Sequence, residues 1–160
     1  MNVRDAIQIS IDTGKMISAG YLSDLTDAEM MKRPCPGCNH ITWQVGHLIA
    51  AERSMIEKVV PGSMPELPAG FAEKYTKETA TSDNPADFHT KAELMAAFEA
   101  TNAATIAALA KMSDADFDKP TGVEYAPTGA SMFAMQGCHW LMHAGQWAVV
   151  RRQCGRAPMF

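Results

Sequence analysis

Apolar residues recur every three or four positions along four stretches of the chain, which is the period of an amphipathic α-helix. The first stretch runs from about 3 to 25, and the second begins near Ile41, after Asn39 as an N-cap, and stops at Pro61-Gly62. The third spans about 91–112 and the fourth about 130–154, where Gly155 suits the end of a helix. The pattern predicts four long helices.

The inward faces follow from the same period. In the first helix the expected buried stripe is Ile7, Ile11, Gly14, Ile17, Tyr21 and Leu25. In the third helix it is Leu94, Phe98, Thr101, Thr105, Leu109 and Met112. Many alanines in this third helix favour helix formation and allow a neighbouring helix to approach closely.

The connections between these helices are irregular. "LTDAEM" is expected to form a turn or short helix, and "RPCPGCN" a loop. The stretch from Pro61 to Thr90 is long for a loop, so one short helix is expected inside it, at about 71–75. Because no segment alternates with period two, we predict an all-α fold. It is a four-helix bundle with a long crossover between helices two and three, in a single domain over residues 1–160.

Composition narrows the classes of function. The chain has 160 residues, a net charge of −4 and no basic block, which argues against a nucleic-acid partner. There is no apolar run of 18 residues and no apolar signal segment at the N-terminus, so neither a membrane span nor secretion is expected. The default location is the cytoplasm, where the four cysteines are expected to be reduced.

Three of the five histidines lie in apolar helical surroundings. His139 and His143 are four residues apart in "GCHWLMHAGQW" and therefore share one helix face, and His47 lies in "ITWQVGHLIAAERSM" on the second helix. Three imidazoles could share one divalent cation, such as Zn, Ni, Cu or Fe, and leave coordination positions open. His40 and His89 lie at helix starts and are expected to be solvated, although His40, two turns before His47, is the rival third ligand.

An ion with open positions could activate a bound water or hold a thiol as thiolate. No carboxylate has the spacing of a general base: Glu52 points about 140° away from His47 on a helix, while Glu124 or Asp118 could enter from the loop before helix four. This absence favours thiolate chemistry over hydrolysis.

Cys35-Pro36-Gly37-Cys38 leaves three alternatives open. The two cysteines could form a redox pair, or half of a zinc site completed by His40 and Cys138 or Cys154, or they could be loop residues without a special role. The three tryptophans, Trp43, Trp140 and Trp147, belong to the core or a dimer interface, or else form an aromatic wall for an apolar substrate.

Two segments, "ITWQVGHLIAAE" and "HWLMHAGQWAVVRRQCGRAP", resemble the DinB-like superfamily of metal-binding four-helix bundles. The resemblance covers nearly the whole chain and implies that His47, His139 and His143 form a metal triad. It further implies that Gly145-Gln146 pack the helix and support the ligands, and that many members are homodimers. The "PCPGC" segment is not part of the family pattern.

Several members of that family use a low-molecular-weight thiol, such as bacillithiol or mycothiol, in S-transfer or isomerisation. We therefore predict a divalent-metal-dependent enzyme, a thiol S-transferase with Zn or Ni in a three-histidine site and a small-molecule substrate. A metallo-hydrolase and a non-catalytic metal- or ligand-binding bundle remain the alternatives.

Overall fold

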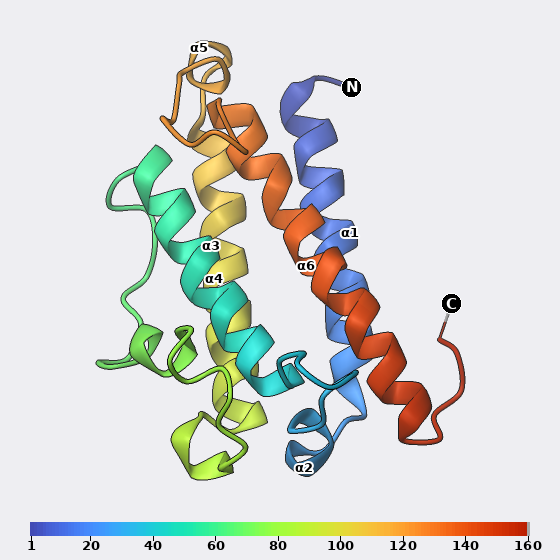
Figure 1. Ribbon diagram of the computed structural model, residues 1–160. Helices are drawn as coiled ribbons and strands as arrows, with labels where there is room; N and C mark the ends of the chain where they lie inside the picture. Colours follow the sequence, from blue (N-terminus) through green and yellow to red (C-terminus); the bar gives the residue numbers. More distant parts are fainter. Residues whose placement is uncertain (160) are drawn as a thin grey trace.

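The computed structural model describes residues 1–159 and is helical throughout, which confirms the all-α prediction (Figure 1). Four long helices dominate it: α1 Val3–Ser23, α3 Ile41–Val59, α4 Lys91–Lys111 and α6 Gly129–Gln153. Over the described residues there is no strand, only an isolated bridge between Pro120 and Thr128. The four long helices agree with the predicted ranges to within two residues at each end.

Four short elements lie in the connections. They are α2 Asp27–Met30, η1 Ala72–Tyr75, η2 Pro85–Asp87 and α5 Asp114–Phe117. The short helices expected in "LTDAEM" and near 71–75 are therefore present, while α5 falls in a connection that the sequence predicted to be irregular.

Side-chain caps fix where the long helices begin. Asn2 with Asp5 forms a capping box at α1, and Thr90 with Glu93 forms one at α4. The sequence-based choice of Asn39 as the cap of α3 is wrong. His40 is the N-cap, and its Nδ1 accepts a hydrogen bond from the backbone N–H of Trp43 at 3.0 Å.

In Figure 1, α6 lies beside α1 on one side and beside α3 on the other, and α4 lies behind α3. The α1–α6 contact is close because two glycines face each other there: a Cβ built at Gly14 would lie 2.7 Å from the carbonyl oxygen of Gly137. A Cβ at Gly137 would in turn collide with the carbonyl oxygen of Ser10. The backbones of α1 and α6 can approach this far only without side chains at these positions.

The predicted inward faces are confirmed for α4, where all six expected residues are buried. In the first helix the prediction holds for Ile7, Ile11 and Gly14, and for Leu25 just beyond the end of α1. Between Gly14 and Leu25 the buried stripe moves by one position. Ser18 and Leu22 are buried, whereas Ile17 and Tyr21 are half-buried.

The connection between α3 and α4 is held against the start of α3. The ring of Tyr75 packs directly on Gly46, where any added Cβ would collide with it. The indole N–H of Trp43 donates to the carbonyl oxygen of Thr76 at 3.2 Å. Because Trp43 and Gly46 lie four residues and one residue before His47 in α3, these contacts fix the helix turn that carries His47.

Among the helices of residues 1–159, none is both long and apolar enough to cross a membrane.

Candidate metal centre

The imidazoles of His47, His139 and His143 converge between α3 and α6. Their ring centres are 5.2 to 6.0 Å apart, and one ring nitrogen from each lies within 4.8 Å of the others. Within the part of the chain that the structure describes, no other group of three or more His, Cys, Asp or Glu side chains comes close enough to share an ion. The predicted convergence is therefore present, with all ligand atoms nitrogen.

The hydrogen bonds of Gln44 settle which nitrogen of His143 is free. The Gln44 Nε2 group donates to the carbonyl oxygen of Asn39 at 2.6 Å, which can only accept, so Gln44 Oε1 faces the other way. That oxygen accepts from the indole N–H of Trp147 at 2.9 Å and lies 3.0 Å from Nδ1 of His143. Since an amide oxygen only accepts, this network assigns the hydrogen to Nδ1 of His143 and leaves Nε2 with the lone pair that can bind a metal.

Burial keeps the three rings neutral. It lowers the pKa of His47, and it lowers the pKa of His139 together with a smaller effect of the His47 charge. The pKa of His143 falls to about 4, first through burial and then through the neighbouring imidazoles His139 and His47. Neutral imidazole is the form that binds a metal, so the site is ready for a cation at neutral pH without prior loss of protons.

Trp43 orients the third ring. Its indole stacks on the His47 imidazole with ring centres 5.0 Å apart and an angle of 9° between the planes. The same indole N–H contacts the carbonyl oxygen of Thr76 and the hydroxyl of Thr79, each at 3.2 Å. The connection between α3 and α4 therefore contributes to the placement of His47.

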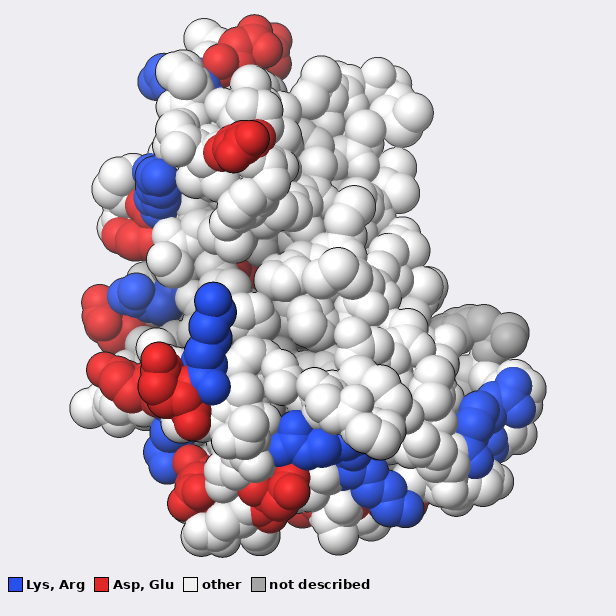
Figure 2. Space-filling view, in the orientation of Figure 1, with Lys and Arg blue, Asp and Glu red and all other residues white. Residues whose placement is uncertain are grey.

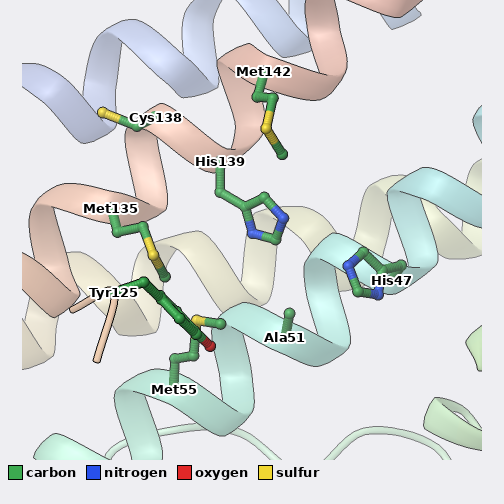
Figure 3. Close-up of a pocket in the computed structure, with 8 residues that line it drawn as sticks. All are labelled: His47, Ala51, Met55, Tyr125, Met135, Cys138, His139 and Met142. Carbon is green, nitrogen blue, oxygen red and sulfur yellow. The ribbon is translucent and has the colours of Figure 1, made fainter. Parts of the chain in front are cut away.

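A half-open cavity of about 420 Å³ adjoins two of the three histidines (Figure 3). His47 and His139 line it, and His143 does not. Ala51 and Met55 of α3 and Met135 and Met142 of α6 form its sides, and Tyr125 reaches it from the loop before α6. Sequence analysis missed Tyr125, because nothing in a loop sequence shows which site its side chain will reach.

Several residues considered from the sequence lie elsewhere. His40 is fully buried rather than solvated and is not in the histidine group, so its role as a rival ligand is wrong. His89, also expected to be solvated, is half-buried, and its Nδ1 lies 2.8 Å from the Tyr75 hydroxyl. Glu124 and Asp118 are exposed and do not line the cavity, so neither enters the site.

Glu52 points into the core, as its helical angle predicted. Its carboxyl accepts hydrogen bonds from the Thr105 hydroxyl at 2.6 Å and from the indole N–H of Trp140 at 2.7 Å. Burial is the main influence and raises the pKa of Glu52. With both oxygens engaged on the far side of α3, this carboxyl is not available to the histidine site.

Trp140 and Trp147 are buried in the core, which confirms the first alternative given for the tryptophans and rules out a substrate wall formed by these two. The interpretation of Gly145 is wrong. Gly145 is exposed and has no atom within 4 Å of a Cβ built on it, so it does not pack the helix. Gln146 contacts Gln44 at 3.0 Å and reaches the ligands only through it. The residue that supports His143 directly is Gln44, which sequence analysis did not single out.

Cys35 and Cys38 form a disulfide, whereas the sequence argument expected free thiols. Gly37, with φ of +81°, turns the chain so that the Cys38 N–H donates to the Cys35 carbonyl oxygen at 3.1 Å. Cys138 and Cys154 are free and lie in no ligand group with the pair, which rules out the shared zinc site over residues 1–159. The cytoplasmic location stays a prediction.

Comparison with known proteins identifies a family. A sequence model described as the DinB superfamily matches residues 11–147, which include all three histidines. Neither the curated proteins nor the solved structures gave a match.

Proposed function

Because the chain belongs to the DinB superfamily, we propose that His47, His139 and His143 bind one divalent metal ion, Zn or Ni, and that the protein is a metal-dependent thiol S-transferase. The observation that carries the proposal is the convergence of three neutral imidazoles with no carboxylate among them. Nitrogen ligands without carboxylates suit these ions rather than Mg or Ca. A three-ligand site leaves positions open for a reactant.

The residues around the site favour S-transfer over hydrolysis. When bound, a divalent ion lowers the pKa of a thiol or water that it contacts. Hydrolysis would also need a base to direct water, and the nearest candidates are engaged or exposed: Glu52 in the core, Glu124 and Asp118 at the surface. For a low-molecular-weight thiol such as bacillithiol or mycothiol, a sulfur–carbon bond forms and the bond to the leaving group breaks with its electron pair. The thiol proton passes to solvent.

Neighbouring side chains orient the histidines of this site. Gln44 fixes the His143 tautomer and Trp43 fixes the plane of His47, so two of the three ligands are oriented before an ion arrives. The cavity beside His47 and His139 gives the second reactant a place next to the ligands.

We further propose that the four long helices are the four-helix bundle of this family and that the connection over 61–90 is its crossover. We also propose a homodimer. Exposed apolar side chains on the α1 and α6 surface, among them Ile9 and Val149, support it. Light scattering after gel filtration tests the dimer, and Ile9→Lys should shift it toward the monomer.

Metal analysis of protein purified without an affinity tag is the first test, and about one Zn or Ni per chain is expected. Zn²⁺ and Ni²⁺ are then titrated into chelator-treated protein and into His143→Ala, which should lose binding. His89→Ala is the matched control, because His89 is half-buried and outside the group. Equal binding by both variants would contradict the metal site.

Activity is tested by transfer of bacillithiol or mycothiol onto an electrophilic aryl halide, with wild type and His143→Ala compared. Cleavage of esters or amides with no thiol transfer would favour the metallo-hydrolase. If His143→Ala loses thermal stability and the wild type turns over neither kind of substrate, the non-catalytic bundle is favoured.

A further inference from the structure

The surface of the cavity beside the histidines is mostly apolar. Four of the lining residues carry polar atoms: His47 and His139 of the histidine group, Tyr125 with its hydroxyl and Cys138 with a free thiol. No Asp, Glu, Lys or Arg lines it. A charged group placed inside would lose part of its hydration without meeting a side chain of opposite charge, which is unfavourable.

The surroundings have the same character. In Figure 2, most Lys, Arg, Asp and Glu gather along the left and lower edges of this face, with further acidic groups toward the top, while the surface over the middle of α6 is largely uncharged. Met142 and Tyr125, both at the cavity, are 62% and 69% exposed. Large apolar side chains left in water at the mouth of a cavity gain free energy when an apolar molecule covers them.

The walls can adapt to shape. Figure 3 shows Met55 and Met135 on either side of Tyr125, with Met142 farther along α6. Methionine side chains are flexible and polarizable, and they form favourable contacts with aromatic rings. A volume of about 420 Å³ is toward the small end of the range for cavities that hold small molecules.

We propose that this cavity binds the apolar body of a neutral small-molecule substrate and presents its reacting atom to the His47–His139 side of the site. The inference rests on the proposed function and adds the substrate class to it. The cavity takes an uncharged electrophile with an aliphatic or aromatic body, and it rejects anions and cations. A charged thiol cosubstrate keeps its polar groups outside the cavity, in solvent.

Binding is measured with the neutral fluorescent dye N-phenyl-1-naphthylamine on the full chain, as purified and again after chelation. Dye fluorescence should rise with saturable binding in both forms, because the cavity walls do not depend on the ion. Unbranched primary alcohols then displace the dye. Each added methylene should tighten binding about fourfold until the cavity is full. In the chelated protein, where no ion can attract it, a dicarboxylate of equal chain length should not compete.

Variants locate the dye. Met142→Lys should weaken dye binding about tenfold, because it places an ammonium group at the cavity mouth. Met16→Lys is the matched control: Met16 is 59% exposed on α1 and does not line the cavity, so affinity should not change. Ala51→Phe should abolish dye binding, because the phenyl ring fills the cavity. Far-UV circular dichroism establishes that each variant is folded.

Three results would overturn the inference: no saturable dye binding, equal effects of Met142→Lys and Met16→Lys, or equal competition by alcohol and dicarboxylate. Dye affinity that falls as protein concentration rises would also overturn it, because a second copy would then cover the cavity. Dye binding is measured with and without metal and needs no turnover, so it is independent of the proposed reaction. Dye binding without S-transfer would contradict the proposed reaction but still support the apolar binding site.

Discussion

The side-chain oxygen of Gln44 on α3 lies 3.0 Å from Nδ1 of His143 on α6, and it also accepts from Trp147. One amide thus links the two helices that carry the histidines and sets the tautomer of one of them. Gln44 is buried and has all its hydrogen-bonding groups engaged, which keeps this arrangement rigid.

Gln44→Met should weaken metal binding about 10- to 100-fold, because His143 loses the acceptor that orients its ring. Metal affinity is measured by competition with a chromophoric chelator, and unfolding is followed in parallel so that affinity refers to folded protein. Gln146→Met is the control, since Gln146 accepts a hydrogen bond from Gln44, while the side-chain hydrogen bond to His143 comes from Gln44. Equal losses in the two variants would argue against a specific role of Gln44.

Gly137→Ala should destabilise the protein by about 1–3 kcal/mol, because the new methyl group collides with the Ser10 carbonyl on α1. Gly145 lies in the same helix, and a methyl group added there has no atom within 4 Å. Gly145→Ala should be neutral or stabilising by up to about 1 kcal/mol, because alanine favours helix. Urea unfolding followed by circular dichroism measures both. A similar effect at the two glycines would show that α1 and α6 do not cross closely at Gly137.

Glu52→Gln should stabilise the protein at neutral pH. Burial raises the pKa of Glu52 above the 4.5 of a free carboxyl, so the folded chain holds this proton more tightly than the unfolded chain. Wild-type stability therefore declines as pH rises above 4.5 and levels off beyond the folded pKa, by about 1.4 kcal/mol per unit of elevation. Gln cannot titrate, so its advantage should grow over that window.

The measurement is urea unfolding of Glu52→Gln and wild type from pH 4 to 8, with Glu124→Gln as an exposed control for the change of net charge. A constant difference across the series would mean that Glu52 does not titrate in this range.

His40→Asn should reduce the loss of stability in acid. The pH dependence from His40 has the opposite sign to that from Glu52, because the pKa of His40 is lowered whereas that of Glu52 is raised. Burial, helped by the Arg33 charge, lowers the pKa of His40 to about 4 from 6.5. The stabilising contribution of the neutral ring is therefore complete above pH 6.5 and is lost as pH falls toward 4, by up to about 1.4 kcal/mol per pH unit. Protonation would also occupy the Nδ1 that caps α3.

Asn keeps a capping oxygen but cannot titrate in this range. Unfolding of His40→Asn and wild type is compared between pH 4 and 7 with a chelator present, so that metal binding does not contribute. Identical slopes for the two proteins would show that His40 is not the group that titrates.

The N-caps of the helices show where rules based on neighbouring residues predict a helix start correctly and where they fail. Thr90 with Glu93 and Thr128 with Ser131 form caps that depend on residues three positions apart. At α3 the same rules chose Asn39, but the cap is His40, since burial against Phe88 places that ring at the helix start. A preference measured over many helices does not include such a tertiary contact.

The sequence by itself determined the four long helices, the buried face of α4 and the pairing of His139 with His143, because helical period and i, i+4 spacing are properties of neighbouring residues. Only the tertiary structure decided that Gln44 holds His143, that Tyr125 reaches the cavity and that the buried stripe of α1 moves to Ser18 and Leu22. These depend on how the helices rotate and how closely they approach, as Gly14 and Gly137 allow. Such relations join residues far apart in the chain, and no local pattern encodes them.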